Sequence, residues 1–250
     1  MPAYKYPRRR AIRFVMHQLS KVALAAVADV EILSPENLPQ NGPLLVVGNH
    51  FNFLDPVAFV RFSPWPIDFI GAAFPPFAPT WTKFITAMWG FYKLYRGTGS
   101  TEALRAAEAI LAQDGILGIF PEGGSWATVL RPARPGTAYL AARSGAKLLP
   151  VGLYGFNDVF PWRLHNRAKP VIKIGEPFGP FKVTGRGRER RQQLNEIGDT
   201  IMRKLADLLP DELRGKYSSD PAARAAAKEV EDYPWDDAPE GRVNGGGVIN

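Results

Sequence analysis

Short apolar runs alternate with amphipathic stretches along most of this chain, and this alternation constrains its fold more than any other feature. The strand-like runs are 44–47, 116–120, 149–152 and 171–174. The helical segments are 100–112, 136–143 and 192–209. Strands that alternate with helices are typical of an α/β domain, in which helices cover a sheet. At 250 residues the chain is long enough for one such domain with short appendages.

Residues 8–29 are predicted to form an amphipathic helix with a basic start. Its apolar residues recur at helical spacing: Ile12, Val15, Leu19, Val22 and Ala26. Arginines cluster at positions 8, 9, 10 and 13. Polar residues interrupt the apolar stretch that a signal peptide or a membrane-spanning helix requires. Two interpretations remain, a helix lying in a membrane interface and a soluble helix packed on the domain.

The charge is distributed unevenly along the chain. The net charge is +7, but residues 211–250 carry nine acidic and five basic side chains, so the first 210 residues carry about +11. A basic body suits an anionic membrane or an anionic thioester donor, or merely keeps the protein soluble. No nucleic-acid-binding pattern is present, and we expect no such partner. We divide the chain into an N-terminal helix (1–29), a main domain (30–210) and a polar, acidic, partly disordered tail (211–250).

An imidazole and a carboxylate follow the first predicted strand. His50 and Asp55, with four residues between them, come directly after the run 44–47. The carboxyl end of a strand is where ligands gather in open α/β sheets. Asp55 can hold one ring nitrogen as a donor, which leaves the other free to take a proton from an attacking hydroxyl. Asp55 also precedes Pro56, so the alternative is a helix N-cap.

Composition excludes several other chemistries. The chain has no cysteine, so a disulfide framework, a thiol nucleophile and a thiolate metal site are impossible. The histidines are His17, His50 and His165, and they show no metal-binding spacing. We expect neither a metal nor another cofactor.

Further segments occur in a characteristic order with His50 and Asp55. They are Gly90 followed six residues later by Arg96, the box Phe120-Pro121-Glu122-Gly123, the apolar–Pro–apolar run 149–152, and the closing run 171–177. In this combination the chain resembles the phospholipid-synthesis acyltransferases, the family of 1-acylglycerol-3-phosphate and lysophospholipid acyltransferases. The resemblance covers about residues 30 to 210.

The resemblance implies a fold and an activity. The fold is a single mixed, largely parallel sheet flanked by helices, here with the N-terminal amphipathic helix. The activity is transfer of a fatty acyl group from an acyl-CoA or acyl-carrier-protein thioester to a hydroxyl of lysophosphatidic acid or a related lysolipid, in glycerolipid biosynthesis. His50 would be the general base and Asp55 its orienting partner. The implied acceptor-binding residues are Arg96, Glu122, Gly123 and Arg134.

Two points about the acceptor stay open at this stage. Members that act on lysophosphatidic acid usually continue Glu-Gly-Thr-Arg, whereas this chain has Gly124 and Ser125 after Gly123. Other lysolipids, glycolipids and further lipid hydroxyls are therefore possible acceptors. For Arg96 and Glu122, the alternative to substrate binding is a structural ion pair at the end of the sheet.

Two other functions are alternatives to acyl transfer. Ser125, after Gly123 and Gly124, approximates the nucleophile elbow of a serine hydrolase, with Asp158 and His165 as its only downstream partners. That interpretation leaves His50, Asp55 and Glu122 unexplained. A non-catalytic membrane-binding module would keep the basic helix, but it has no need of His50 together with Asp55.

Aromatic and proline residues cluster in 62–66 and 74–81. We predict that Trp65, Phe74, Phe77 and Trp81 form a rim that dips into lipid beside the active site, with a well-packed surface loop as the alternative. Together with the basic helix, this rim predicts a monotopic protein on the cytoplasmic face of a membrane. The sequence leaves the donor type, the acyl-chain length and the oligomeric state open.

Overall fold

The computed structural model describes residues 4–72, 82–94, 101–125, 127–160 and 166–231. The α-helices are α1 (Arg10–Val27), α2 (Asp55–Phe62), α3 (Thr82–Trp89), α4 (Thr101–Leu111), α5 (Pro135–Ser144), α6 (Gly187–Ala206) and α7 (Pro221–Ala227). The strands are β1 (Glu31–Leu33), β2 (Leu44–Gly48), β3 (Ile67–Ala72), β4 (Tyr92–Leu94), β5 (Ile116–Ile119), β6 (Lys147–Tyr154) and β7 (Val171–Ile174). The 3-10 helices are η1 (Pro35–Asn37), η2 (Phe156–Val159), η3 (Asp211–Leu213), η4 (Gly215–Tyr217) and η5 (Lys228–Val230).

The strands form one sheet in the order β1-β7-β6-β2-β5-β3-β4. Neighbouring strands run parallel, except for the antiparallel pair of β6 and β7. The central strand β2 lies between β6 and β5, with Leu44 opposite both Lys147 and Ile116. The carboxyl ends of these three strands therefore lie side by side, and the residues that follow them meet at one edge of the sheet. The predicted fold class, a single mixed and largely parallel sheet flanked by helices, is confirmed.

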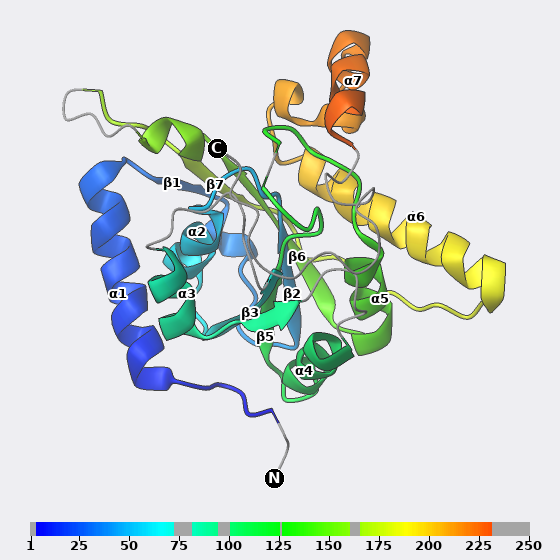
Figure 1. Cartoon of the computed structure of the whole chain (residues 1–250), viewed down its shortest axis with the longest axis horizontal. Helices are drawn as coiled ribbons and strands as arrows, with labels where there is room; N and C mark the ends of the chain where they lie inside the picture. The colour runs from blue at the N-terminus through cyan, green and yellow to red at the C-terminus, as the bar shows by residue number, and fades with distance from the viewer. Residues whose placement is uncertain (1–3, 73–81, 95–100, 126, 161–165, 232–250) are drawn as a thin grey trace, which may run out of the picture.

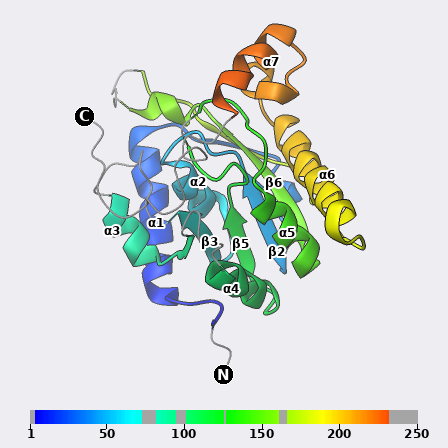
Figure 2. The ribbon, with the colours of Figure 1, turned by 45° about the vertical axis from the view of Figure 1, so that its right-hand side comes forward.

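Helices cover both faces of the sheet, with α1, α2 and α3 on one side and α4, α5 and α6 on the other (Figures 1 and 2). Successive residues of β2 point to opposite faces. Leu44 and Val46 belong to the apolar cluster on the α1–α3 side, and Leu45 and Val47 belong to the cluster on the α4–α6 side. All four side chains are buried. A strand buried on both faces reads as a continuous apolar run, which is why β2 was recognisable in the sequence.

The patterning predicted α1, α4, α5 and α6, and the strands β2, β5, β6 and β7, to within a few residues. It did not predict β1, β3 or β4, which are short or contain polar residues such as Asp68. Strands β3 and β4 pair with each other in parallel and extend the sheet beyond β5.

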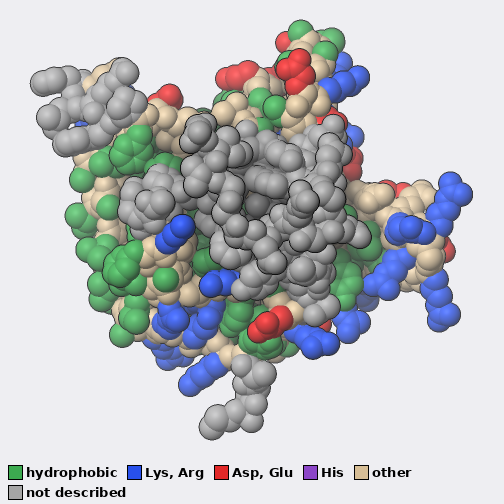
Figure 3. Space-filling model, in the orientation of Figure 1, with side chains coloured by type: hydrophobic (Ala, Val, Ile, Leu, Met, Phe, Trp, Pro, Cys, Tyr) green, Lys and Arg blue, Asp and Glu red, His purple; other side chains and the backbone are tan. Residues whose placement is uncertain are grey.

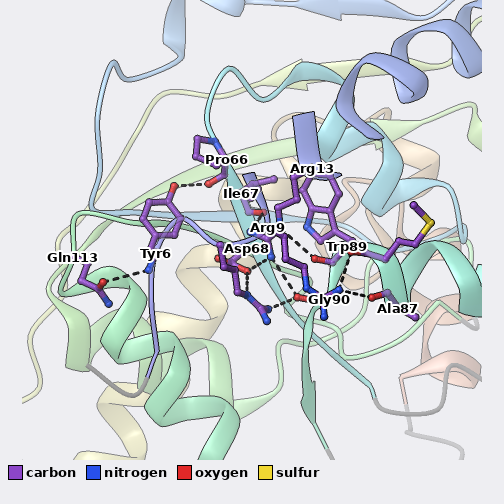
Figure 4. A network of polar contacts seen from close by, with 12 residues as sticks. Tyr6, Arg9, Arg13, Pro66, Ile67, Asp68, Ala87, Trp89, Gly90 and Gln113 are labelled. Carbon is purple, nitrogen blue, oxygen red and sulfur yellow. Dashed lines mark hydrogen bonds and ion pairs between the residues drawn. The ribbon is translucent and has the colours of Figure 1, made fainter. Parts of the chain in front are cut away.

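Arginines in α1 and just before it attach the helix to the domain (Figure 4). Arg13 is 3% exposed, its Nη2 lies 2.5 Å from Asp68 Oδ1, and its Nε donates to the carbonyl of Trp89 at 3.1 Å. Arg8 Nε lies 3.0 Å from the same Asp68 oxygen. Arg9 Nη1 donates to two carbonyls at the end of α3. Part of the basic cluster is therefore neutralised within the protein, and less of its charge can reach an anionic surface than the sequence indicates.

The predicted apolar stripe of α1 faces away from the domain. Arg13, Ser20 and Leu24 form the buried face of the helix. The stripe residues are exposed, from Ile12 at 43% to Val22 at 68%, and Phe14 beside them is 64% exposed. In the space-filling view, apolar side chains gather along the side of the molecule where α1 lies (Figure 3). The helix is therefore packed on the domain and also presents an apolar outer face, so the two alternatives for 8–29 are not exclusive.

Residues after Pro210 pack against the segment that follows β5. Leu130 N donates to the carbonyl of Leu213 at 2.9 Å. A side chain at Gly215 would bring its Cβ to 2.1 Å from the Leu130 carbonyl oxygen, and Gly215 has a φ of +54°. The described part of this region ends with α7 and η5. The division into 1–29, 30–210 and 211–250 stays a prediction. Across the ranges the structure describes, no helix has both the length and the apolar character needed to span a bilayer.

Candidate active site

The candidate site begins where β2 ends. Gly48 is required there, because a Cβ would lie 2.6 Å from a ring carbon of Phe59 on α2. The next residue, Asn49, is fully buried and fastens the loop to β6. Its side-chain amide donates to the Leu153 carbonyl at 2.7 Å and accepts from the Leu153 N–H at 2.7 Å. This double contact fixes the backbone direction just before His50.

His50 and Asp55 are in contact, as the sequence predicts. His50 Nδ1 lies 2.9 Å from Asp55 Oδ2. The same oxygen accepts from the backbone N–H groups of Phe51 and Asn52, at 2.8 and 2.7 Å. Leu54 is the N-cap of α2 and Asp55 is its first residue, and the Asp55 carboxylate oxygen contacts residues that precede the helix, so Asp55 is not the predicted N-cap. The loop instead folds around the carboxylate, which holds the imidazole.

Burial and hydrogen bonding act against each other at Asp55. The residue is 1% exposed, and burial raises the pKa of Asp55 although the His50 contact and two backbone N–H donors lower it. A carboxylate can only accept, so the contact with ionised Asp55 requires the hydrogen on His50 Nδ1. Nε2 is then the basic nitrogen of the ring. The side chain of His50 is 18% exposed, and the ring stacks on Phe120 with centroids 4.3 Å apart.

Glu122 contacts His50 through the backbone N–H of His50. Its Oε1 accepts from the His50 backbone N–H at 2.8 Å. Its Oε2 accepts from the backbone N–H of Arg131 at 3.2 Å and lies 3.3 Å from Arg131 Nε. Both residues are 1% exposed. Burial raises the pKa of Glu122 to about 8, with Arg131 as the largest opposing influence. These contacts favour the ion-pair alternative for Glu122 over direct contact with a substrate.

The remaining predicted site residues differ in what the structure says of them. Gly123 is exposed, has a φ of +80°, and donates its N–H to the Phe120 carbonyl at 3.1 Å, which makes the tight turn after β5. Arg134 is half-buried just before α5, and its N–H donates to the Pro121 carbonyl at 2.8 Å. Gly123 and Arg134 therefore both belong to the loop after β5. Arg96 lies outside the described residues.

Two hollows lie at opposite ends of the strands. One of about 230 Å³ adjoins the candidate site, and its walls include Asp55, Asn52, Thr128, Tyr154 and Asp158. A larger one, of about 490 Å³, is lined by Tyr6, Gly42, Trp65, Asp114 and Ile116, at the amino ends of β2, β3 and β5. The smaller hollow is the candidate for the chemistry, because its lining includes Asp55, whose carboxylate contacts His50.

The position of Trp65 corrects one prediction. Trp65 lies at the amino end of β3, and its Nε1 donates to the Gln40 carbonyl at 3.2 Å. His50 follows the carboxyl end of β2, so Trp65 cannot form a rim beside the candidate site. The prolines before β3 hold the chain at the far end of the strands, a placement that local sequence does not encode. Phe74, Phe77 and Trp81 lie outside the described residues.

Sequence reasoning missed Arg131 and Asn49. Asn49 adjoins His50, and a buried polar residue at a strand end is a usable signal. Arg131 has no local signal, because its partner Glu122 is nine residues away across an irregular loop. Of the residues that the hydrolase alternative needs, Ser125 is half-buried, Asp158 is exposed, and His165 lies outside the described residues. Within the part of the chain that the structure describes, no group of three or more His, Asp or Glu side chains could hold a metal ion.

Comparisons with known proteins find similar sequences. A family model described as Acyltransferase matches residues 29–154, which is half of the chain. A 1-acyl-sn-glycerol-3-phosphate acyltransferase of Chlamydomonas reinhardtii is 25% identical over 220 residues, covering 85% of this chain and 63% of that protein. A 1-acyl-sn-glycerol-3-phosphate acyltransferase of Borreliella burgdorferi is 25% identical over 149 residues, covering 58% of this chain and 60% of that protein.

The fold has a solved counterpart. The crystal structure of the 1-acyl-sn-glycerophosphate (LPA) acyltransferase PlsC from Thermotoga maritima superposes with a TM-score of 0.54 at 21% identity, covering 79% of this chain and 82% of that one. At this identity the likeness concerns the fold alone. The aligned regions span about three fifths of the length of the two curated relatives.

Proposed function

Because the chain belongs to the acyltransferase family, we propose that it transfers a fatty acyl group from a thioester donor to a hydroxyl of a lysolipid, in glycerolipid biosynthesis. The observation that carries this proposal is the contact between His50 Nδ1 and Asp55 Oδ2 at the carboxyl end of β2. It leaves the second ring nitrogen of a partly exposed imidazole as a base. A non-catalytic module has no use for such a pair.

The proposed reaction is a direct transfer. His50 Nε2 takes the proton of the acceptor hydroxyl while the hydroxyl oxygen attacks the thioester carbonyl carbon. The tetrahedral intermediate then collapses: the new C–O bond remains, the C–S bond breaks, and the imidazolium returns the proton to the departing sulfur. No acyl-enzyme forms, and no metal or redox group is needed to balance the step. The donor is an acyl-CoA or an acyl-carrier protein.

Asp55 contributes by charge and by orientation. Its carboxylate holds the hydrogen on Nδ1 and opposes the positive charge that the imidazole gains during proton transfer. Two backbone N–H groups and the His50 contact hold the carboxylate in place, so its orientation costs little during the reaction. We assign Asp55 the role of orienting and supporting the base.

The names of the relatives favour lysophosphatidic acid as the acceptor. A specific observation favours a second candidate, a neutral or sugar-bearing lipid. The hollow beside Asp55 has apolar walls from residues such as Phe51 and Leu153, its polar side chains are hydroxyl, amide and carboxyl groups, and among its described lining residues there is no lysine or arginine. Gly124 and Ser125 also stand where family members that act on a phosphate monoester usually have Thr-Arg. Hydroxyl-rich headgroups suit such a lining better than a dianionic phosphate does.

We further propose that the protein binds a membrane surface peripherally, on the cytoplasmic side. The outer face of α1 supports this, because exposed apolar stripes beside basic residues are typical of interfacial helices. Helix α3, which packs against α1, adds Phe84 at 70% exposure. Phe160, 46% exposed, stacks on Phe53, which brings an exposed aromatic ring onto the loop that joins His50 to Asp55. Membrane lipids would then supply the acceptor directly.

The test is a substrate panel with the purified full chain. Acyl-CoA or acyl-carrier protein is incubated with lysophosphatidic acid, lysophospholipids, monoacylglycerol and a glycolipid, and products are identified by mass. Product from lysophosphatidic acid alone supports the first acceptor, and product from neutral lipids alone supports the second. Release of free fatty acid without any acylated lipid, together with fluorophosphonate labelling of Ser125, would replace acyl transfer with the hydrolase alternative.

A further inference from the structure

The backbone of His50 is held by a buried ion pair that reaches across the site. One oxygen of Glu122 accepts from the His50 N–H, and the other faces the main chain and the guanidinium of Arg131. The guanidinium also donates to the carbonyl of Gly124. A single arginine thereby joins the turn after β5 to the loop that returns toward α5, with Glu122 between that arginine and His50.

Burial of the Arg131 charge carries a desolvation cost, and a specific role is needed to account for an arginine at this position. Arg131 is 1% exposed and Glu122 is 1% exposed. The desolvation penalty of such a pair offsets most of the electrostatic attraction between its charges. A protein with an apolar pair of similar volume would therefore be about as stable. Stability alone therefore does not account for Arg131. The pair supplies a fixed hydrogen-bond acceptor for the backbone N–H of His50. The imidazole of the same residue must be aligned for proton transfer.

We propose that Arg131 is a positioning residue of the acyl transfer reaction: it favours the carboxylate form of Glu122, which clamps the His50 backbone, over the protonated form that burial favours, and it thereby fixes the imidazole toward the acceptor hydroxyl. The inference rests on the proposed role of His50 as the base. Arg131 acts through Glu122 and does not touch the reacting atoms.

The charges around Glu122 give this proposal a pH signature. Burial is the largest influence and raises its pKa to about 8, Arg131 lowers it, the backbone N–H groups of His50 and Arg131 lower it, and the charge of Asp55 raises it. Removal of the Arg131 charge leaves burial and Asp55 opposed only by the two backbone donors. Glu122 would then stay protonated to a higher pH, and the clamp would reach full strength only in more alkaline solution, because a neutral carboxyl group accepts more weakly than a carboxylate.

The matched variants are Arg131→Met, Arg131→Lys and Arg143→Met. Methionine fills much of the arginine volume without charge, and lysine restores the charge without the planar fork. Arg143 on α5 makes an exposed ion pair with Glu108 at 3.5 Å and serves as the control. Steady-state kinetics are measured from pH 6 to 10 with the best acceptor of the panel.

We expect Arg131→Met to lower kcat at least about tenfold at pH 7, with both KM values within about threefold, because misplacement of a catalytic group acts on the chemical step. The rising limb of its profile of kcat against pH should move to higher pH by about one unit or more. The profile of Arg131→Lys should lie between those of Arg131→Met and the wild type. In a Glu122→Gln background the Arg131→Met change should no longer move the limb. An unmoved limb, or a kcat within about twofold of wild type, overturns the proposal.

A second measurement does not depend on turnover. Hydrogen exchange of the His50 backbone amide, followed by NMR, reports whether its clamp is intact. Protection should fall at least about tenfold in Arg131→Met and stay unchanged in Arg143→Met. If the substrate panel fails but this protection falls, the proposed function is wrong and the clamp is real. If turnover occurs and protection is unchanged in Arg131→Met, the clamp is wrong and the proposed function stands.

Discussion

Two buried carboxylates of this protein pair with arginine, and they stabilise different parts of the structure. Asp68, near the start of β3, binds Arg8 and Arg13, whose other N–H groups reach the carbonyls of Trp89 and Gly90. Glu122, after the end of β5, binds Arg131 and the backbone of His50. The first pair attaches a helix to the domain, and the second braces the candidate base. The role of a buried ion pair therefore follows from what its remaining polar atoms contact.

The largest effect should come from breaking the Asp68 pair. Asp68→Asn keeps the shape but leaves the charge of buried Arg13 uncompensated, which should lower the free energy of unfolding by about 3–5 kcal/mol. Urea denaturation measures this, with Glu108→Gln as control, because the largely exposed pair of Glu108 and Arg143 is worth under about 1 kcal/mol. At a temperature where the variant is folded, kcat should be near wild type. A kcat loss as large as that of Arg131→Met would remove the distinction between the two pairs.

The Glu122 pair should make stability depend on pH. Its folded pKa is raised from an ordinary 4.5 to about 8, so the folded state binds a proton more tightly than the unfolded state does between these values. The free energy of unfolding should therefore fall as pH rises through this window, by about 1 kcal/mol per pH unit from this group. Asp55, whose pKa is also raised, acts in the same direction. Denaturation of Glu122→Gln across this range should give a shallower slope, and an identical slope would contradict the burial of an ionising Glu122.

The smallest effect on stability is expected on the outer face of α1. Leu19→Glu with Val22→Glu alters exposed side chains, so unfolding should change by less than about 1 kcal/mol. Binding to vesicles that contain anionic lipid should weaken at least about tenfold, because apolar burial is lost and like charge is added. Ala225→Glu with Ala226→Glu on exposed α7 adds the same charge as a control. Equal weakening by both pairs would mean that charge, and not the α1 face, governs binding.

Deletion of the N-terminal helix would not separate membrane release from unfolding. Removal of residues 1–28 would take away Arg8 and Arg13 and leave Asp68 buried without its partners. Loss of vesicle binding or of activity would then report unfolding as readily as it reports membrane release. Point substitutions on the exposed outer face of α1 separate membrane release from unfolding.

The sequence predicted the parts of the site that are local. The apolar run of β2 and the spacing of His50 and Asp55 predicted their contact, because a loop of four residues brings them together at a strand end. The brace by Arg131 was not predictable, since it depends on how an irregular loop folds back over β5. The outward face of α1 was also hidden, because an apolar stripe reads alike whether it meets a core or lipid. The burial of Arg13, Ser20 and Leu24 decides its orientation.

The most direct test of the account is the turnover of His50→Ala under the conditions in which the wild type acylates its best acceptor. Loss of the general base should lower kcat by about 10²–10⁴. The His50 side chain is partly exposed, so the thermal unfolding curve of the variant should stay close to that of the wild type. A folded His50→Ala protein that retained more than about a tenth of wild-type kcat would contradict the assignment of His50 as the base.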